Sequence, residues 1–201
     1  DTNRLTLDFY ARPARVVAQE LLGKRLVRLI DGQRVSGIIV ETEAYCDSVE
    51  PDLACHGSKN KGRPTKRTAV IFGRAGFSYI YLNYGIHWLF NVVTGEAGQA
   101  NGVLVRALEP CEGEPFMQQQ RGKQPRPQWT NGPGKLSQAL AIDKGLNAID
   151  LCCSAEIWLE NGAAPAHISC GPRVGLGKTP EPWLSIEWRY WVTNNQFVSK
   201  G

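Results

Sequence analysis

The chain has 201 residues, of which 42% are hydrophobic and 21% are charged. These proportions are those of a globular protein and exclude a largely disordered, collagen-like or coiled-coil chain, and the apolar runs are too short for a membrane helix of ~20 residues. The formal net charge of +4 is too small to predict a nucleic-acid partner by itself. The length fits one domain, which we expect to span residues 1–201.

The predicted elements begin with a short amphipathic helix at residues 15–22, where Val17, Leu21 and Leu22 recur at helical spacing before Gly23. Strands are predicted at residues 26–30, 35–45, 77–93, 102–108 and 183–192, a second helix at 135–142, and a loop or strand end at 173–177. Long hairpin-like strands with helices at the ends favour one α+β domain over alternating βαβ units.

The strand at residues 37–45 carries two carboxylates. Alternation places Ile39, Glu41, Glu43 and Tyr45 on one face and the residues between them on the other. Glu41 and Glu43 are then ~6.5–7 Å apart. Three interpretations stay open at this point: an exposed polar sheet edge, a carboxylate base beside an aromatic ring, and the carboxylate pair of a glycosidase.

The β-prone stretch at residues 77–93 has a single glycine near its centre, which predicts a hairpin turning at Tyr84-Gly85. A two-residue turn would place Tyr81 opposite Trp88 and Ser78 opposite Asn91. Tyr84 then stands at the tip of a long ribbon. It either folds back onto its own protein or acts as a wedge between stacked bases.

Charge is distributed unevenly along the chain. Residues 57–74 carry six Lys and Arg side chains and no acid, and residues 118–135 carry four more, again without an acid. Each segment alone would be read as solvated surface. Two such loops together favour a polyanionic partner.

The sequence contains no familiar metal or cofactor motif. Its six cysteines form no C-x-x-C pair, its three histidines are dispersed, and neither a Walker loop nor a G-x-G-x-x-G pattern is present. The start of the chain is polar and carries no signal peptide. We therefore expect no metal, no cofactor, reduced thiols and a cytoplasmic location.

A set of short motifs, taken in order, points to one family. They are Val40-Glu41-Thr42-Glu43-Ala44-Tyr45, Ala54-Cys55-His56, Gly62-Arg63 with Thr65 and Arg67, Tyr79-Ile80-Tyr81, Tyr84-Gly85, Asn91-Val92-Val93, residues 104–110, residues 132–136, residues 138–142 and Arg173-Val174-Gly175. Together they resemble the alkyladenine (3-methyladenine) DNA glycosylases, in a minimal bacterial-type form. The blocks span nearly the whole chain.

The resemblance implies a compact, single-domain α+β fold with a curved, largely antiparallel sheet and a protruding β-hairpin. It also implies a monofunctional glycosylase that releases alkylated or deaminated purines (3-methyladenine, hypoxanthine or ethenoadenine) from duplex DNA by nucleotide flipping. The partner would be double-stranded DNA with damaged purines, the protein a monomer near the nucleoid, without a cofactor or a membrane.

Carried over position by position, the resemblance makes Glu43 the base that activates a water for attack on C1′, with Arg106 holding that carboxylate. Tyr84 would fill the gap left in the duplex. The pocket for the flipped base would be formed by Tyr45, His56, Tyr81, Asn91 and Leu104, with Asn91 opposing guanine. DNA-backbone contacts would come from Arg63, Thr65, Arg67 and Lys135.

Two rival interpretations remain on the sequence alone. The basic loops and the hairpin would also suit a non-catalytic module that binds duplex DNA. A carbohydrate hydrolase using Glu41 and Glu43 would leave the basic loops and the tip tyrosine without a role.

Overall fold

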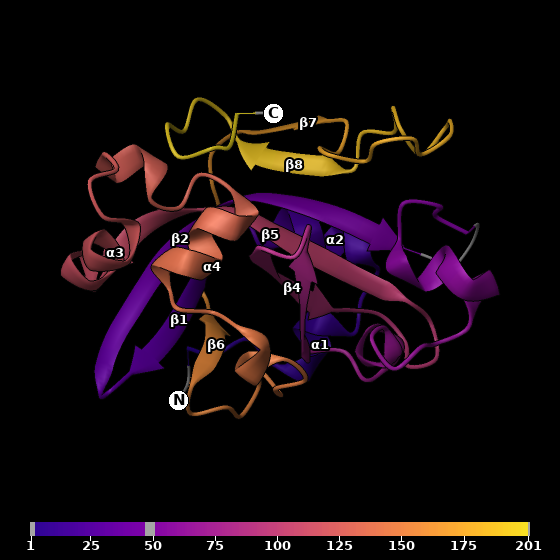
Figure 1. The fold of residues 1–201 in the computed structure, drawn as a ribbon, viewed down its shortest axis with the longest axis horizontal. Coiled ribbons are helices and arrows are strands. Elements are labelled where there is room, and N and C mark those ends of the chain that lie inside the picture. The colour runs from indigo at the N-terminus through magenta and orange to yellow at the C-terminus, as the bar shows by residue number, and fades with distance from the viewer. Residues whose placement is uncertain (1–2, 47–50, 201) are drawn as a thin grey trace.

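The computed structural model describes residues 3–46 and 51–200. Residues 1–2, 47–50 and 201, which the single-domain prediction includes, lie outside the described residues. The elements, labelled in Figure 1 where there is room, are α1 (Leu7–Tyr10), α2 (Ala14–Glu20), β1 (Arg25–Ile30), β2 (Gln33–Cys46), η1 (His56–Gly62), η2 (Ala69–Phe72), β3 (Ser78–Asn83), β4 (His87–Val93), β5 (Asn101–Glu112), α3 (Glu114–Arg121), η3 (Arg126–Gln128), α4 (Pro133–Ala139), η4 (Lys144–Leu146), β6 (Ile157–Glu160), β7 (Ile168–Gly171) and β8 (Arg189–Val192).

The described strands form one sheet in the order β3-β4-β5-β2-β1-β6, and every pairing in it is antiparallel. The long strand β2 organises this sheet. It pairs with β5 on one side, while on the other its first half pairs with β1 and its second half with β8, which also pairs with β7. The prediction of an α+β fold with a largely antiparallel sheet is confirmed.

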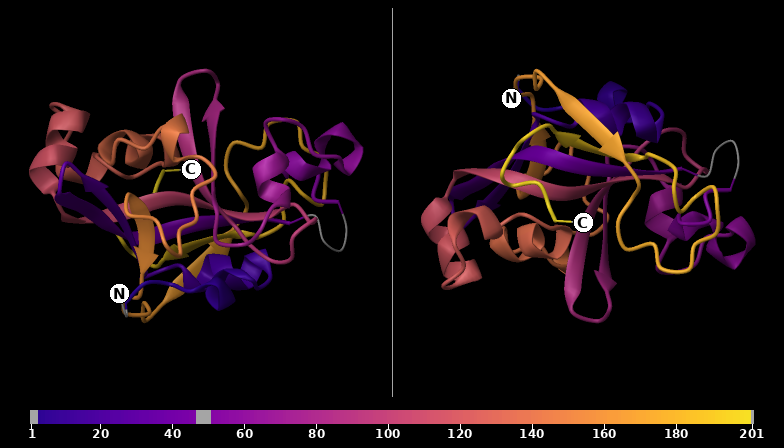
Figure 2. Two further views of the ribbon diagram at one scale, coloured as in Figure 1. Left: turned by 90° about the horizontal axis from the view of Figure 1, so that it is seen from below. Right: turned by 90° about the horizontal axis from the view of Figure 1, so that it is seen from above.

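The two faces of the sheet are covered differently (Figure 2). Helices α1 and α2 lie on one face, where the hydroxyl of Thr42 donates to the carbonyl of Ala18 at 2.7 Å. Helices α3 and α4, the η1 segment and the β3–β4 hairpin lie on the other. The main core includes fully buried Val17, Leu108 and Leu136, from α2, β5 and α4. The second face, which carries the hairpin, is the one that holds the site described below.

Strand β2 departs from simple alternation at a β-bulge. Ile39 pairs with Leu108 and Glu41 with Ala107, so Val40 is an extra residue on β2. The prediction that Ile39 shares a face with Glu41 is therefore wrong: Ile39 belongs to the main core, and Val40 packs instead in a small cluster with Ala107. A bulge inserts one residue and reverses the phase of the side chains beyond it.

The β3–β4 hairpin protrudes from the body, as predicted (Figure 2). Its turn lies at Tyr84-Gly85, where both residues have positive φ (49° and 72°). The predicted register is wrong by one residue, because Ile86 also belongs to the loop, so that Asn83 pairs with His87. In consequence Tyr81 pairs with Leu89 and Ser78 with Val92, and Asn91 lies opposite Tyr79.

The last predicted strand is shorter than expected, since only Arg189–Val192 is a strand. Upstream of it, the carbonyl of Trp183 accepts a hydrogen bond from Arg173, and the ring centroids of Trp183 and Trp188 are 5.7 Å apart. This segment therefore makes side-chain contacts in place of strand pairing. Helix α4 begins at Pro133, two residues before its predicted start, with a proline in its first turn. None of the described helices is long and apolar enough to cross a membrane.

Candidate active site

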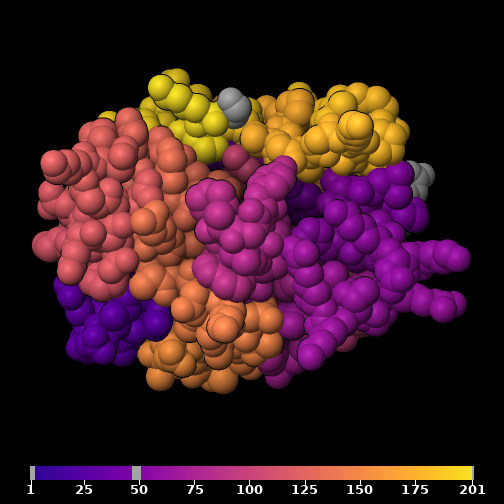
Figure 3. Space-filling view, viewed as in Figure 1, coloured from indigo at the N-terminus to yellow at the C-terminus, as the bar shows by residue number. Residues whose placement is uncertain are grey.

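A cavity of about 520 Å³ opens beside the hairpin, a size typical of ligand pockets. Figure 3 looks onto this face, with the hairpin at its centre between the α3–α4 region and the η1 segment. The lining comes from the end of β2, residues 53–59, the hairpin, β5 and residues 174–179. Seven of the predicted site residues line it: Tyr45, His56, Tyr81, Tyr84, Asn91, Leu104 and Arg106.

Aromatic rings form one wall of this cavity. The rings of His56 and Tyr81 lie 4.4 Å apart between centroids, and Tyr79 packs against Tyr81 at 5.4 Å. The hydroxyl of Tyr79 and Nδ1 of His56 are hydrogen-bonded at 2.9 Å, which fixes the imidazole. Sequence reasoning missed Tyr79 as a site residue, although its i, i+2 spacing from Tyr81 in a strand was the available signal.

Glu43 lies directly behind the cavity wall and is fully buried. Its Oε2 accepts a hydrogen bond from the hydroxyl of Tyr45 at 2.7 Å, and its Oε1 accepts one from the backbone N–H of Val174 at 2.6 Å. Nη1 of Arg106 is 3.2 Å from the same Oε1. Both neighbouring side chains, Tyr45 and Arg106, line the cavity, so the carboxylate is one residue away from the space that a ligand would fill.

Arg106 reaches this carboxylate from a second bulge. Glu41 pairs with Ala107 and Thr42 with Val105, so Arg106 is the extra residue of β5. Bulges are frequent beside active sites because they redirect a side chain. Burial lowers the pKa of Arg106, but the charges of Glu43 and Glu41 outweigh it and raise that pKa overall, so the guanidinium stays charged.

Tyr45 is held between Glu43 and Arg173. The guanidinium carbon of Arg173 lies 4.6 Å from the centre of the tyrosine ring. Burial raises the pKa of the Tyr45 hydroxyl, and the Glu43 charge adds to the effect, so the phenol keeps its proton and donates a hydrogen bond to the carboxylate. The ring is thus fixed in place at the edge of the cavity.

Asn91 presents one particular atom to the cavity. Its Nδ2 donates to the carbonyls of Tyr79 at 3.1 Å and Leu89 at 3.3 Å. Within the described residues no hydrogen bond is made by its Oδ1. The amide orientation is therefore set by the backbone, and the oxygen is the atom left for a ligand.

Comparisons with known proteins identify the family of this chain. A family model described as methylpurine-DNA glycosylase (MPG) matches residues 8–196. Relatives with the provisional name 3-methyladenine DNA glycosylase include proteins of Desulfitobacterium hafniense (45% identity; 98% of this chain and 98% of the relative), Methanocella arvoryzae (44%; 98% and 96%) and Myxococcus xanthus (46%; 99% and 95%). The chain belongs to the methylpurine-DNA glycosylase family. The expectation that it is an enzyme, a hydrolase of N-glycosyl bonds, is confirmed.

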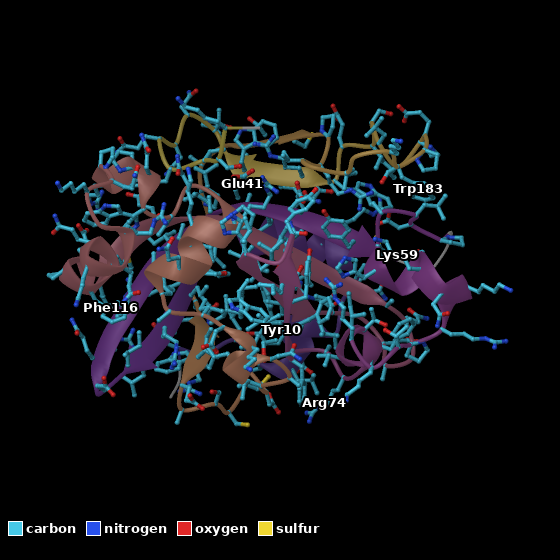
Figure 4. All side chains as sticks on the ribbon, viewed as in Figure 1. Tyr10, Glu41, Lys59, Arg74, Phe116 and Trp183 are labelled. Atoms are coloured by element: carbon cyan, nitrogen blue, oxygen red, sulfur yellow. The ribbon has the colours of Figure 1, made fainter. Side chains whose placement is uncertain are left out.

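The basic residues expected at DNA are only partly gathered at the cavity beside the hairpin. A smaller hollow of about 180 Å³ adjoins it and is lined by His56, Lys59, Asn60, Thr65, Arg67 and Thr68. Arg67 also stacks on the Tyr81 ring at 5.4 Å. Lys59, labelled in Figure 4, lines both hollows and was not among the predicted contacts. Arg63 is exposed outside both, and Lys135 bonds to Oδ1 of Asn131 at 2.9 Å on α4.

The histidine that lines the cavity, His56, is neutral at pH 7. Burial lowers the pKa of His56 to about 4, and the charges of Lys59 and Arg67 contribute. Burial likewise raises the pKa of the Tyr79 hydroxyl to about 12. The aromatic wall is therefore uncharged at neutral pH, and such a wall can attract a cationic ring.

Glu41 occupies no part of the cavity lining. It is fully buried and bonded to Arg106, Arg189 and Ser199. Glu41 accepts three hydrogen bonds at Oε1 and one from the backbone N–H of Ser199 at Oε2, so its oxygens are committed to structural partners, which disfavours a role as the second group of a glycosidase pair. In the described part of the chain, no group of three or more His, Cys, Asp or Glu side chains is arranged to hold a metal ion.

Proposed function

We propose that this protein is a monofunctional DNA glycosylase that excises alkylated and deaminated purines of the 3-methyladenine, hypoxanthine and ethenoadenine type from duplex DNA. The observation that carries the proposal is the buried Glu43–Arg106 pair behind an aromatic-lined cavity. Residues 1–201 act as one catalytic domain and as a monomer, at the nucleoid of the cytoplasm. The activity would open base excision repair.

Flipping is required because a base inside the duplex is out of reach of the cavity, and extrusion costs a few kcal/mol. Tyr84, at the tip of the hairpin, is 82% exposed and would take the place of the extruded base. The flipped purine would lie between Tyr45 on one side and His56 with Tyr81 on the other. Stacking of this kind contributes about 1–3 kcal/mol per base.

Selectivity would follow from charge and from shape. Some alkylated purines are cationic and are attracted to neutral aromatic faces, which the uncharged His56 and its tyrosine neighbours supply. Asn91 would exclude guanine sterically, because its fixed side chain would occupy the space that the 2-amino group needs, although Oδ1 is itself a hydrogen-bond acceptor. Its fixed amide cannot turn aside without losing its bonds to the backbone.

Hydrolysis develops oxocarbenium character on the sugar, which an adjacent carboxylate stabilises. Glu43 would remove a proton from the attacking water, while Arg106 orients the carboxylate. Each carboxylate oxygen has two lone-pair sites, and Oε2 accepts one hydrogen bond from the described residues, that of Tyr45. The attacking water would take the remaining lone-pair site of Oε2, beside the Tyr45 hydroxyl at the edge of the cavity.

The test is replacement of Glu43 by glutamine, which keeps the size of the side chain and removes its basicity. Single-turnover release of free base from alkylated or hypoxanthine-containing duplexes should fall by about 10²–10⁴-fold. Affinity for the same duplexes should persist. Glu109→Gln on β5 serves as the matched control and should keep the wild-type rate. Near-normal base release by Glu43→Gln would falsify the mechanism, and the lack of any base release by the wild-type protein would leave only a DNA-binding module.

A further inference from the structure

We propose that Glu41 is a positioning residue that, together with Ser199, holds Arg106 so that Glu43 remains free to activate water. The inference deepens the proposed function and rests on it. It gives a role to Glu41, which does not line the cavity, and to Ser199, which follows the last strand, β8.

Glu41 is fully buried, and both its oxygens are occupied. Its Oε1 accepts from Nε of Arg106 at 2.8 Å, from Nε of Arg189 at 2.7 Å and from the hydroxyl of Ser199 at 2.8 Å. Its Oε2 accepts from the backbone N–H of Ser199 at 2.7 Å. Figure 4 labels Glu41 where β2 runs beside β8. The carboxylate is thus a fixed anchor.

The guanidinium of Arg106 is held from three directions. Nε donates to Glu41, Nη2 donates to the hydroxyl of Ser199 at 3.1 Å, and Nη1 lies 3.2 Å from Oε1 of Glu43. A planar guanidinium held at two of its nitrogens has a fixed orientation. Because Arg106 sits in a bulge, it lacks the regular pairing that would otherwise set its direction.

Glu41 and Glu43 share the positive charge of Arg106, and this division affects how Glu43 can bind a water. Two carboxylates and two guanidiniums meet here, of which only the Arg189 guanidinium is partly exposed, and Glu41 binds the Nε side of Arg106. Without the negative charge of Glu41, Arg106 would turn toward the one remaining carboxylate and grip Glu43 through two nitrogens. A carboxylate bound in that way has fewer lone pairs for a water and is a weaker base.

Glu41→Gln tests this role, because glutamine keeps the shape and removes the charge. Its single-turnover rate of base release should fall by about 10- to 100-fold through misplacement of the catalytic pair. Affinity for the lesion duplex and the fluorescence of a flipped ethenoadenine should stay at the wild-type values. Glu109→Gln is the matched control: Glu109 also bonds to the segment after β8, through Asn195 at 2.8 Å, but does not contact Arg106.

A double-mutant cycle separates positioning from general destabilisation. In an Arg106→Gln background, Glu41→Gln should cost no further rate, because the residue through which it acts is gone. An equal loss in both backgrounds, or a loss of affinity as large as the loss of rate, would overturn the proposal. If Glu41→Gln fails to fold, Ser199→Ala takes its place in the same cycle; it removes one hydroxyl and should give a smaller loss with the same dependence on Arg106.

The proposed function can fail separately. It fails if the wild-type protein releases no base or if Glu43→Gln releases it normally. Where the wild type is active and Glu43→Gln is not, an unchanged rate in Glu41→Gln overturns the positioning role alone.

Discussion

At the scale of single residues, the site depends on side chains that each make two kinds of contact, Arg106 and Tyr45. Arg106 follows Val105, a core residue, yet it points to two carboxylates because a bulge redirects it. A lysine at this position would offer one point charge instead of a fork and could not hold Glu41 and Glu43 at the same time. Tyr45 likewise lines the cavity and, through its hydroxyl, is bonded to Glu43.

His56 gives a prediction about pH and stability. Its pKa is about 4 in the folded protein and near 6.5 when unfolded, so between these values the unfolded chain binds the extra proton. The stability that comes from keeping His56 neutral is therefore fully present above pH 6.5 and is lost as the pH falls toward 4. The loss should amount to about 3 kcal/mol in the free energy of unfolding, from 1.36 kcal/mol per pKa unit.

Urea titrations at several pH values measure this effect. In His56→Gln the fall in the free energy of unfolding between pH 6.5 and pH 4 should be smaller than in the wild type. His167, which is exposed, provides the control, and His167→Gln should retain the wild-type pH dependence. Identical slopes for His56→Gln and the wild type would contradict the prediction.

At the scale of elements, the β3–β4 hairpin presents large apolar side chains to solvent. Tyr84 is 82% exposed and Ile86 is 71% exposed at its tip, whereas its base pairs with β5 and packs on α4. The tip can therefore be changed without disturbing the core. Exposure of this apolar surface to water is unfavourable, and a partner that covered the tip would remove that penalty.

Tyr84→Ser should weaken stable flipping and leave folding intact. Loss of one stacked ring should reduce the affinity for a lesion duplex by about 1–3 kcal/mol. The fluorescence of ethenoadenine, which reports its stacking, should move toward the value of free duplex. Leu184→Ser, an exposed apolar residue away from the hairpin, is the control. Unchanged affinity and fluorescence in Tyr84→Ser would rule out the wedge.

For the whole molecule, one buried ion pair joins the separate walls of the cavity. Arg173 forms two hydrogen bonds with Asp52, at 2.6 and 2.9 Å, and both side chains are fully buried. Arg173 also donates to the carbonyls of Ala44 and Trp183. The end of β2, the loop before η1 and the segment before β8 thus meet at one guanidinium.

Asp52→Ala should be strongly destabilising, because it leaves Arg173 buried without its partner. A loss of about 3–5 kcal/mol in the free energy of unfolding is expected from urea denaturation. The exposed pair Arg12–Glu20 gives the comparison, since Glu20→Ala should cost less than about 1 kcal/mol. Similar losses for the two variants would show that the buried pair does not hold the walls together.

The sequence by itself determined the local features of this protein. Alternation on β2 predicted that Glu43 and Tyr45 share a face, and a glycine between β-prone residues predicted the hairpin with Tyr84 at its tip. These features follow from the geometry of a few consecutive residues. The ordered motifs also sufficed to indicate the family.

Only the tertiary structure decided how these parts meet. The bulges at Val40 and Arg106, the one-residue shift in the hairpin and the contacts of Ser199 with Glu41 have no signal in the local pattern. Each depends on the pairing and packing of segments distant in sequence, and a bulge forms where that packing favours one more residue on a strand. The Glu43–Arg106 pair was therefore predictable as two residue types, and its geometry was not.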